Sequence, residues 1–223
     1  MTKLLVDDRE IEAKQGTTLL QACLENDIYI PNLCYLEEME HPQASCRMCF
    51  VEIEGENEPV VSCSVQVRNG LVVRTDTPFV RRLQRSALRL LLSVHDVDCA
   101  NCPANKTCEL QRMAKFLKVA LKPKGLEQFL KEPQIEEEHP VLNYYPNRCV
   151  VCGKCVFVNQ KGPGKPFLTF ANRGFETVIS FHGQEDAPPL PDETYKACVE
   201  VCPVGAITLK ENDTHFPGAK EGS

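Results

Sequence analysis

The chain has 223 residues, of which 43% are hydrophobic and 25% are charged, and its formal net charge is −6 at pH 7. This composition excludes a largely disordered chain, and the acidic balance argues against a nucleic-acid partner, because phosphate binding needs a surplus of Lys and Arg. No stretch approaches 18 consecutive apolar residues and the N-terminus lacks a signal-peptide pattern, so we expect a soluble, cytoplasmic protein with no direct membrane insertion.

The first eighty residues predict a small β-rich domain. Two short strands around a polar turn indicate a hairpin, and Thr18 is suited to cap the helix that follows. Cys23 falls on the apolar face of that helix, so we interpret it as a packing residue. The expected elements are strands at 3–6, 10–13, 50–53, 60–65 and 71–73 and a helix at 18–26.

Four cysteines lie inside this domain, in the loop after the helix and in the strands beyond it. A C-x2-C pair with a remote fourth cysteine is typical of [2Fe–2S] ferredoxins, although the first gap here is wider than the plant-type gap of about four residues. A β-grasp domain with a longer cluster loop accounts for this spacing, and a zinc site is the alternative. This first set comprises Cys34, Cys46, Cys49 and Cys63.

An amphipathic pattern from Pro78 to Val94 predicts a long helix that ends beside a histidine. Three cysteines follow in the spacing H-x3-C-x2-C-x5-C, which by itself is more typical of zinc. Zinc has no redox chemistry and would interrupt a redox pathway, so we interpret this set as a His-ligated [4Fe–4S] cluster. The second set comprises His95, Cys99, Cys102 and Cys108, and another helix is expected after it.

Prolines and charges in residues 121–147 indicate an extended connector, and a C-x2-C-x2-C run follows it. Such a run meets three corners of a [4Fe–4S] cube, and a remote cysteine before a proline supplies the fourth ligand. This third set comprises Cys149, Cys152, Cys155 and Cys202.

Zinc bound by Cys149, Cys152, Cys198 and Cys202 is the alternative for the third set, but it would leave Cys155 without a role. We therefore interpret Cys198, like Cys23, as a packing residue. A pair of strands is expected at 167–170 and 176–181, and a polar, disordered tail at 211–223.

Several strings around these ligands are similar to one family: Ile30 to Cys34, Ser45 to Cys49, Cys108 to Gln111, and Cys202 to Ile207. They resemble the N-terminal cluster-bearing region of the 75-kDa-type subunit of respiratory complex I. They resemble even more its short form, the diaphorase gamma subunit of NAD-linked soluble hydrogenases. The resemblance implies one [2Fe–2S] cluster on the first set and [4Fe–4S] clusters on the second and third sets.

The resemblance also implies a role as an electron-transfer subunit of an NAD(P)(H)-linked oxidoreductase, with no catalytic residue of its own. The implied partners are a flavin- and NAD(H)-binding subunit, a small [2Fe–2S] subunit and a catalytic hydrogenase, dehydrogenase or other acceptor subunit. The alternatives are a zinc-stabilised interaction module without redox chemistry and a diffusible multi-cluster ferredoxin.

We expect an α+β fold in successive parts. These are an N-terminal β-grasp [2Fe–2S] ferredoxin domain (1–78), a helical His/Cys3 [4Fe–4S] segment (79–120), an extended connector (121–147), a small α+β [4Fe–4S] ferredoxin-like domain (148–210) and the tail (211–223).

Overall fold

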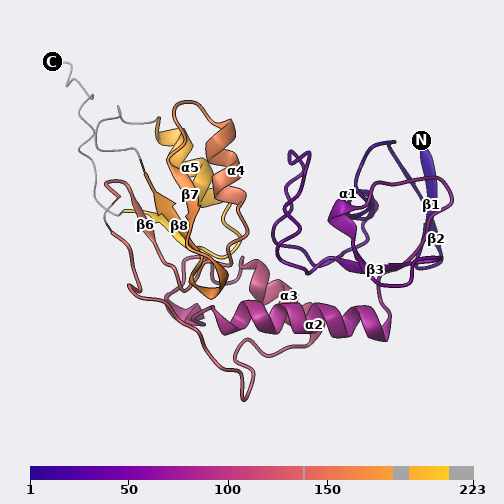
Figure 1. The fold of residues 1–223 in the computed structure, drawn as a ribbon, viewed down its shortest axis with the longest axis horizontal. Coiled ribbons are helices and arrows are strands. Elements are labelled where there is room, and N and C mark those ends of the chain that lie inside the picture. Colours follow the sequence, from indigo (N-terminus) through magenta and orange to yellow (C-terminus); the bar gives the residue numbers. More distant parts are fainter. Residues whose placement is uncertain (138, 183–190, 211–223) are drawn as a thin grey trace.

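The computed structural model describes residues 1–137, 139–182 and 191–210. The molecule is elongated, with an N-terminal domain at one end and a C-terminal domain at the other (Figure 1). A long helix, α2, runs beneath both of them and connects them. The fold is α+β, as expected from the sequence.

A five-stranded sheet forms the N-terminal domain, in the order β2-β1-β5-β3-β4. The first two strands make the expected antiparallel hairpin, and β5 adds to β1 in parallel, so the end of the domain returns to its beginning. The strands are β1 (Thr2–Val6), β2 (Arg9–Ala13), β3 (Phe50–Ile53), β4 (Val60–Val61) and β5 (Val72–Arg74).

Helix α1 (Leu19–Glu25) packs its apolar face into this domain. The hydroxyl of Thr18 accepts a hydrogen bond from the Gln21 amide at 3.2 Å, which satisfies a donor of the first turn. Cys23 is fully buried, and burial raises the pKa of its thiol to about 12. The interpretation of Cys23 as a core residue is confirmed.

The strand expected at 60–65 is wrong beyond Val61. Residues Ser62–Ser64 form a 3₁₀ turn instead. The amide and the hydroxyl of Ser62 both donate to the Cys49 carbonyl at 2.9 Å, so the turn is tied to the cluster loop. This turn brings Cys63 beside Cys49, which a continued strand would not do.

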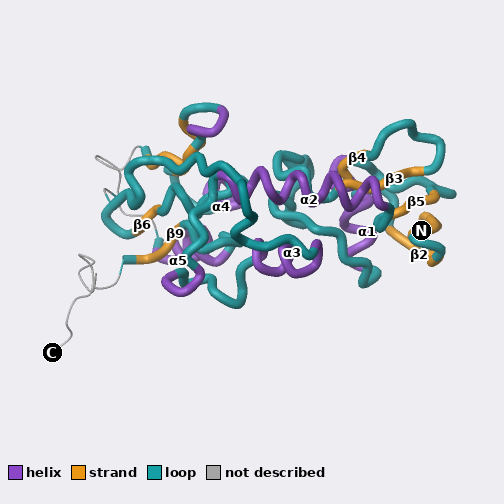
Figure 2. Tube along the Cα trace, turned by 90° about the horizontal axis from the view of Figure 1, so that it is seen from below, coloured by secondary structure: helices purple, strands orange, loops and turns teal. Residues whose placement is uncertain are grey.

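Helix α3 (Glu109–Leu117) packs along one side of helix α2 (Pro78–Ser93) (Figure 2). The Thr77 hydroxyl caps α2 by accepting from the Val80 amide at 3.1 Å. At the far end of α3, Arg85 Nε donates to the Leu117 carbonyl at 2.9 Å. The two helices therefore form one unit, and each of them was expected from its amphipathic pattern.

The C-terminal domain has the order β-α-β-β-α-β. Two pairs of antiparallel strands, β6 with β9 and β7 with β8, accompany two helices that contact each other. The expected strand pair is confirmed, whereas the helices and the outer strands were not foreseen, and β6 lies inside the expected connector. The elements are β6 (Leu142–Tyr144), α4 (Lys154–Lys161), β7 (Leu168–Ala171), β8 (Val178–Phe181), α5 (Asp192–Glu200) and β9 (Ile207–Leu209).

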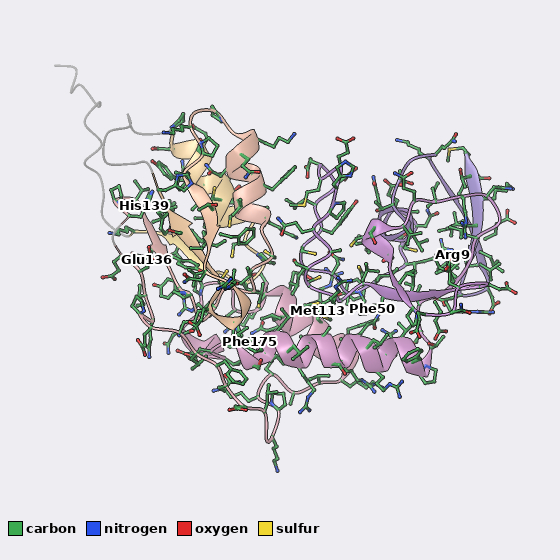
Figure 3. All side chains as sticks on the ribbon, viewed as in Figure 1. Arg9, Phe50, Met113, Glu136, His139 and Phe175 are labelled. Carbon is green, nitrogen blue, oxygen red and sulfur yellow. The ribbon has the colours of Figure 1, made fainter. Side chains whose placement is uncertain are left out.

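Two apolar cores support these parts. One lies within the N-terminal domain, and the other joins α2, α3 and the C-terminal domain. Leu33 and Met48, from the loop of the first cysteine set, belong to the second core. Phe50 lies just above α2 in Figure 3, and its carbonyl accepts from Gln84 Nε2 at 3.1 Å. The first site is thereby fixed against the helical unit.

Within the described parts of the chain, no helix has the length and apolarity needed to cross a membrane. The tail expected at 211–223 lies outside the described residues.

Candidate metal centres

The first cysteine set lies in the buried loop between α1 and β3 and in the turn after β4, and its four sulfur atoms form two pairs. The sulfur atoms of Cys34 and Cys46 are 3.4 Å apart. Their hydrogen bond lowers the pKa of Cys34 to about 5 and raises that of Cys46. In the same way, a hydrogen bond with Cys63 lowers the pKa of Cys49, while the pKa of Cys63 rises.

Two sulfur pairs fit a [2Fe–2S] cluster, because each of its two irons takes two of the four thiolate ligands. The donor set is all thiol and buried, with the four residues between 1% and 6% exposed. A thiolate in each pair is already stabilised by its neighbour, and thiolate is the form that binds iron.

The second set surrounds the start of α3. Residues Cys99–Asn101 form one 3₁₀ turn, and Cys108 is the residue that caps α3. Burial raises the pKa of Cys108, whereas the amides of Gln111 and Leu110 hydrogen bond to its sulfur and oppose that rise. The charges of Cys102 and Cys99 also act on Cys108, so the three thiols lie within electrostatic range of one another.

His95 is buried just past the end of α2. Its Nδ1 lies 3.0 Å from the Arg148 carbonyl, which can only accept, so Nδ1 carries the proton and Nε2 is left for a metal. Burial lowers the pKa of the imidazole, which favours the neutral form that binds metals. The ring therefore has the tautomer and charge of a ligand.

The third set lines one small pocket. Its walls include Cys149, Cys152, Cys155 and Cys202, and the other lining residues are almost entirely apolar. Burial raises the pKa of Cys149, Cys152 and Cys155, so an apolar pocket of this kind holds thiolates only when a cation is bound among them. Among the residues that the structure describes, no three His, Cys, Asp or Glu side chains form a site for a single metal ion.

Hydrogen-bond donors surround the sulfurs of this third pocket. The Val151 amide donates to Cys149 at 3.4 Å, and the Ala206 amide donates to Cys202 at 3.2 Å. The fully buried phenol of Tyr144 also hydrogen bonds to Cys149. Because the Tyr144 oxygen accepts from the Ile179 amide at 3.0 Å, its proton is directed to the sulfur. Such donors stabilise thiolate, so the pocket fits a cluster.

Cys198 does not line this cavity. It is fully buried on α5, and its sulfur lies 3.8 Å from the Cys155 carbonyl, at the distance of a thiol that donates to a helix. Burial raises its pKa to about 12. These contacts are those of a packing residue.

The second and third sites are joined by direct contacts. Arg148 links them twice, because its carbonyl meets His95 and its Nη2 donates to the Asn101 carbonyl at 3.2 Å. The Glu109 amide donates to the Pro203 carbonyl at 3.0 Å. Gly205 has a positive φ of 64°, and a Cβ added there would lie 2.9 Å from the Ala104 side chain, so only glycine fits this contact.

Sequence reasoning did not find Tyr144 or Arg148. Both precede the third cysteine run by a few residues, but neither belongs to a recognised spacing. A polar aromatic residue among apolar ones in a short strand is the one signal that the sequence offers for Tyr144.

Three family models match the chain in succession. They describe a 2Fe-2S iron-sulfur cluster binding domain at residues 1–78, an NADH-ubiquinone oxidoreductase-G iron-sulfur binding region at 84–121, and an NADH-quinone oxidoreductase subunit 3 ferredoxin-like domain at 139–208. Each matched segment contains one of the three sets. The chain therefore has a [2Fe–2S] domain followed by [4Fe–4S] binding regions.

Relatives of known type match nearly the whole chain. The NADPH-Fe(3+) oxidoreductase subunit alpha of Geobacter sulfurreducens is 34% identical over 94% of this chain and 24% of its own length. The NADH-ubiquinone oxidoreductase 75 kDa subunit of Reclinomonas americana is 32% identical over 94% of this chain and 30% of its own length. The chain thus spans less than a third of the length of these relatives.

A solved structure agrees with these matches. A chain from the crystal structure of an NAD+-reducing [NiFe]-hydrogenase in the H2-reduced state superimposes with a TM-score of 0.82 and 28% identity, and the match covers 97% of this chain and 90% of that one. The resemblance inferred from the cysteine strings is confirmed by these models, relatives and fold. Over nearly its whole length, the chain corresponds to the N-terminal iron–sulfur region of the complex I 75-kDa-type subunit.

Proposed function

We propose that this chain is the iron–sulfur electron-transfer subunit of a multi-subunit NAD(P)(H)-linked oxidoreductase of the hydrogenase, formate dehydrogenase or NADH dehydrogenase type. The observation that supports it best is the pocket lined by Cys149, Cys152, Cys155 and Cys202, in direct contact with the loop of the second set. Clusters held there would accept and give up single electrons. The proposed location is the cytoplasm.

The proposed cofactors are one [2Fe–2S] cluster and two [4Fe–4S] clusters, one of them with a histidine ligand. The first set would hold the two-iron cluster, because its sulfurs are paired. The third set would hold a four-iron cluster in its pocket. The second set would hold the other four-iron cluster, with His95 as its fourth ligand.

The proposed partners are those that the resemblance implies. A flavin- and NAD(H)-binding subunit with a small [2Fe–2S] subunit would lie on one side, and a catalytic hydrogenase, dehydrogenase or other acceptor subunit on the other. This chain would supply no catalytic residue, so hydride chemistry would take place on the flavin of the partner.

Anaerobic purification of the native complex tests this function. We expect a brown protein with about ten iron atoms per chain from one two-iron and two four-iron clusters, together with a co-purifying flavoprotein. Stoichiometric zinc without visible absorbance would contradict the redox function and favour the zinc-stabilised module. Iron in a chain that migrates alone on size exclusion would instead identify a diffusible ferredoxin.

Replacement of the histidine, His95→Cys, should lower the midpoint potential of the second cluster. A thiolate in place of neutral imidazole adds one negative charge, which disfavours a further electron. The measurement is a redox titration followed by electron paramagnetic resonance. His182→Cys is the matched control, because this exposed residue lies in the C-terminal domain away from the second set. An unchanged or higher midpoint in His95→Cys would contradict the expected direction of the shift.

A further inference from the structure

Among the residues that the structure describes, a buried lysine beside the third site has no partner for its charge. Lys131 is 5% exposed, and its Nζ has no hydrogen-bond partner in the described structure. Its backbone is held in place, because Lys131 N donates to Asn147 Oδ1 at 2.7 Å and Asn147 Nδ2 donates to the Lys131 carbonyl at 2.9 Å. Lysine side chains ordinarily extend until the ammonium group reaches water, and the ammonium group of Lys131 does not.

A buried ammonium is costly unless a negative charge lies nearby. The group that meets this need is at Cys149, two residues beyond Asn147. Two hydrogen bonds join Lys131 to Asn147, so the lysine is held beside the segment that enters the third site, and its charge acts on Cys149. A four-iron cluster with four thiolate ligands has a net negative charge in both oxidation states and gains one more on reduction.

We propose that Lys131 is the buried counter-charge of the third cluster and raises its reduction potential. Lys131 would bind no iron. Its charge would act on the cluster through the ligand Cys149, so it is a positioning residue. This inference rests on the proposed [4Fe–4S] cluster of the third set. The Asn147 carbonyl also accepts from the Asp96 amide at 2.7 Å, next to His95, so the second cluster should feel a smaller effect.

The test is a redox titration of the intact complex, followed by electron paramagnetic resonance, with Lys131→Met, Lys131→Arg and Lys154→Met. Lys131→Met should lower the midpoint of the third cluster, with a fall of about tenfold in the one-electron equilibrium constant, which is about 59 mV. The shift should be smaller for the second cluster and absent for the first. Lys131→Arg keeps the charge and should stay close to the wild type.

Lys154→Met is the matched control, because Lys154 is partly exposed and its charge also acts on a ligand of this cluster, Cys152. Water and salt screen that charge, so its removal should shift the midpoint less, and less again at high ionic strength. Equal shifts from the two methionine variants, or equal shifts in all three clusters, would overturn the proposal.

Loss of the cluster gives an answer as well. If Lys131→Met loses it and Lys131→Arg retains it, the cluster requires a cationic side chain at this position, and the proposal stands. If both lose it, charge is not what Lys131 provides, and the proposal fails. If instead the proposed function is wrong, the wild-type complex itself would show no signal from a cluster in the third set. That result is distinguishable from both outcomes for the variants.

Discussion

A chain with Cys202→Ala should lose the third cluster, whereas a chain with Cys198→Ala should retain all of its iron. Cys202 lines the third pocket and accepts the Ala206 amide, while Cys198 faces the Cys155 carbonyl from within α5. Removal of Cys202 therefore opens one corner of the proposed cube, and removal of Cys198 leaves only a small gap that costs about 1 kcal/mol of stability.

Iron analysis and electron paramagnetic resonance measure the outcome. Cys202→Ala should lower the iron content by about four atoms per chain and abolish one four-iron signal, with the signals of the other clusters still present. Cys198→Ala serves as the control, with the same substitution four residues away. If Cys198→Ala lost the same iron, Cys198 would be a ligand. The alternative set of Cys149, Cys152, Cys198 and Cys202 would then be favoured.

Removal of iron should unfold the C-terminal domain before the N-terminal one. The C-terminal domain has only two-stranded sheets, which are marginal alone, and the cysteines of the third set lie inside its core. Metal bound by residues of the core contributes its binding free energy to folding. The N-terminal domain has a five-stranded sheet and a core of its own, so it should keep more of its structure.

Hydrogen exchange measured by region, before and after treatment with a chelator and an oxidant, tests this order. We expect loss of amide protection in β6 to β9 and in the loop of the second set, with protection retained in β1, β2 and α1. Cys202→Ala provides the comparison, because it should reproduce the change in the C-terminal domain with the first cluster still present. Equal loss of protection in both domains would refute the order.

Much of the fold could be predicted from local signals. The hairpin of β1 and β2 and the helices α1 and α2 were found because polar turns, capping threonines and apolar periodicity act within a few residues. The strands β6 and β9 were missed, since three residues carry no usable period and their pairing depends on segments more than sixty residues apart. The turn at Ser62–Ser64 was missed because the cluster loop, and not strand propensity, decides its shape.

The candidate sites divide in the same way. Cysteine spacing predicted the grouping of the third set, because C-x2-C-x2-C constrains three ligands to one winding of backbone. The roles of Tyr144 and Lys131 could not be predicted, since each residue is placed near the third site by the packing of a segment outside the cysteine run. The ligand sets themselves stay predictions until the metal is measured.

The contacts between the second and third sites set an order for biogenesis. A nascent chain synthesised only as far as Leu121 contains every residue of the second set, yet it lacks the Arg148 carbonyl that orients His95 and the Pro203 carbonyl that receives the Glu109 amide. The first site has its sheet complete by Arg74 and needs neither. The sheet that supports the first site can therefore form early in synthesis, whereas the second site is completed only after the ribosome has passed Pro203.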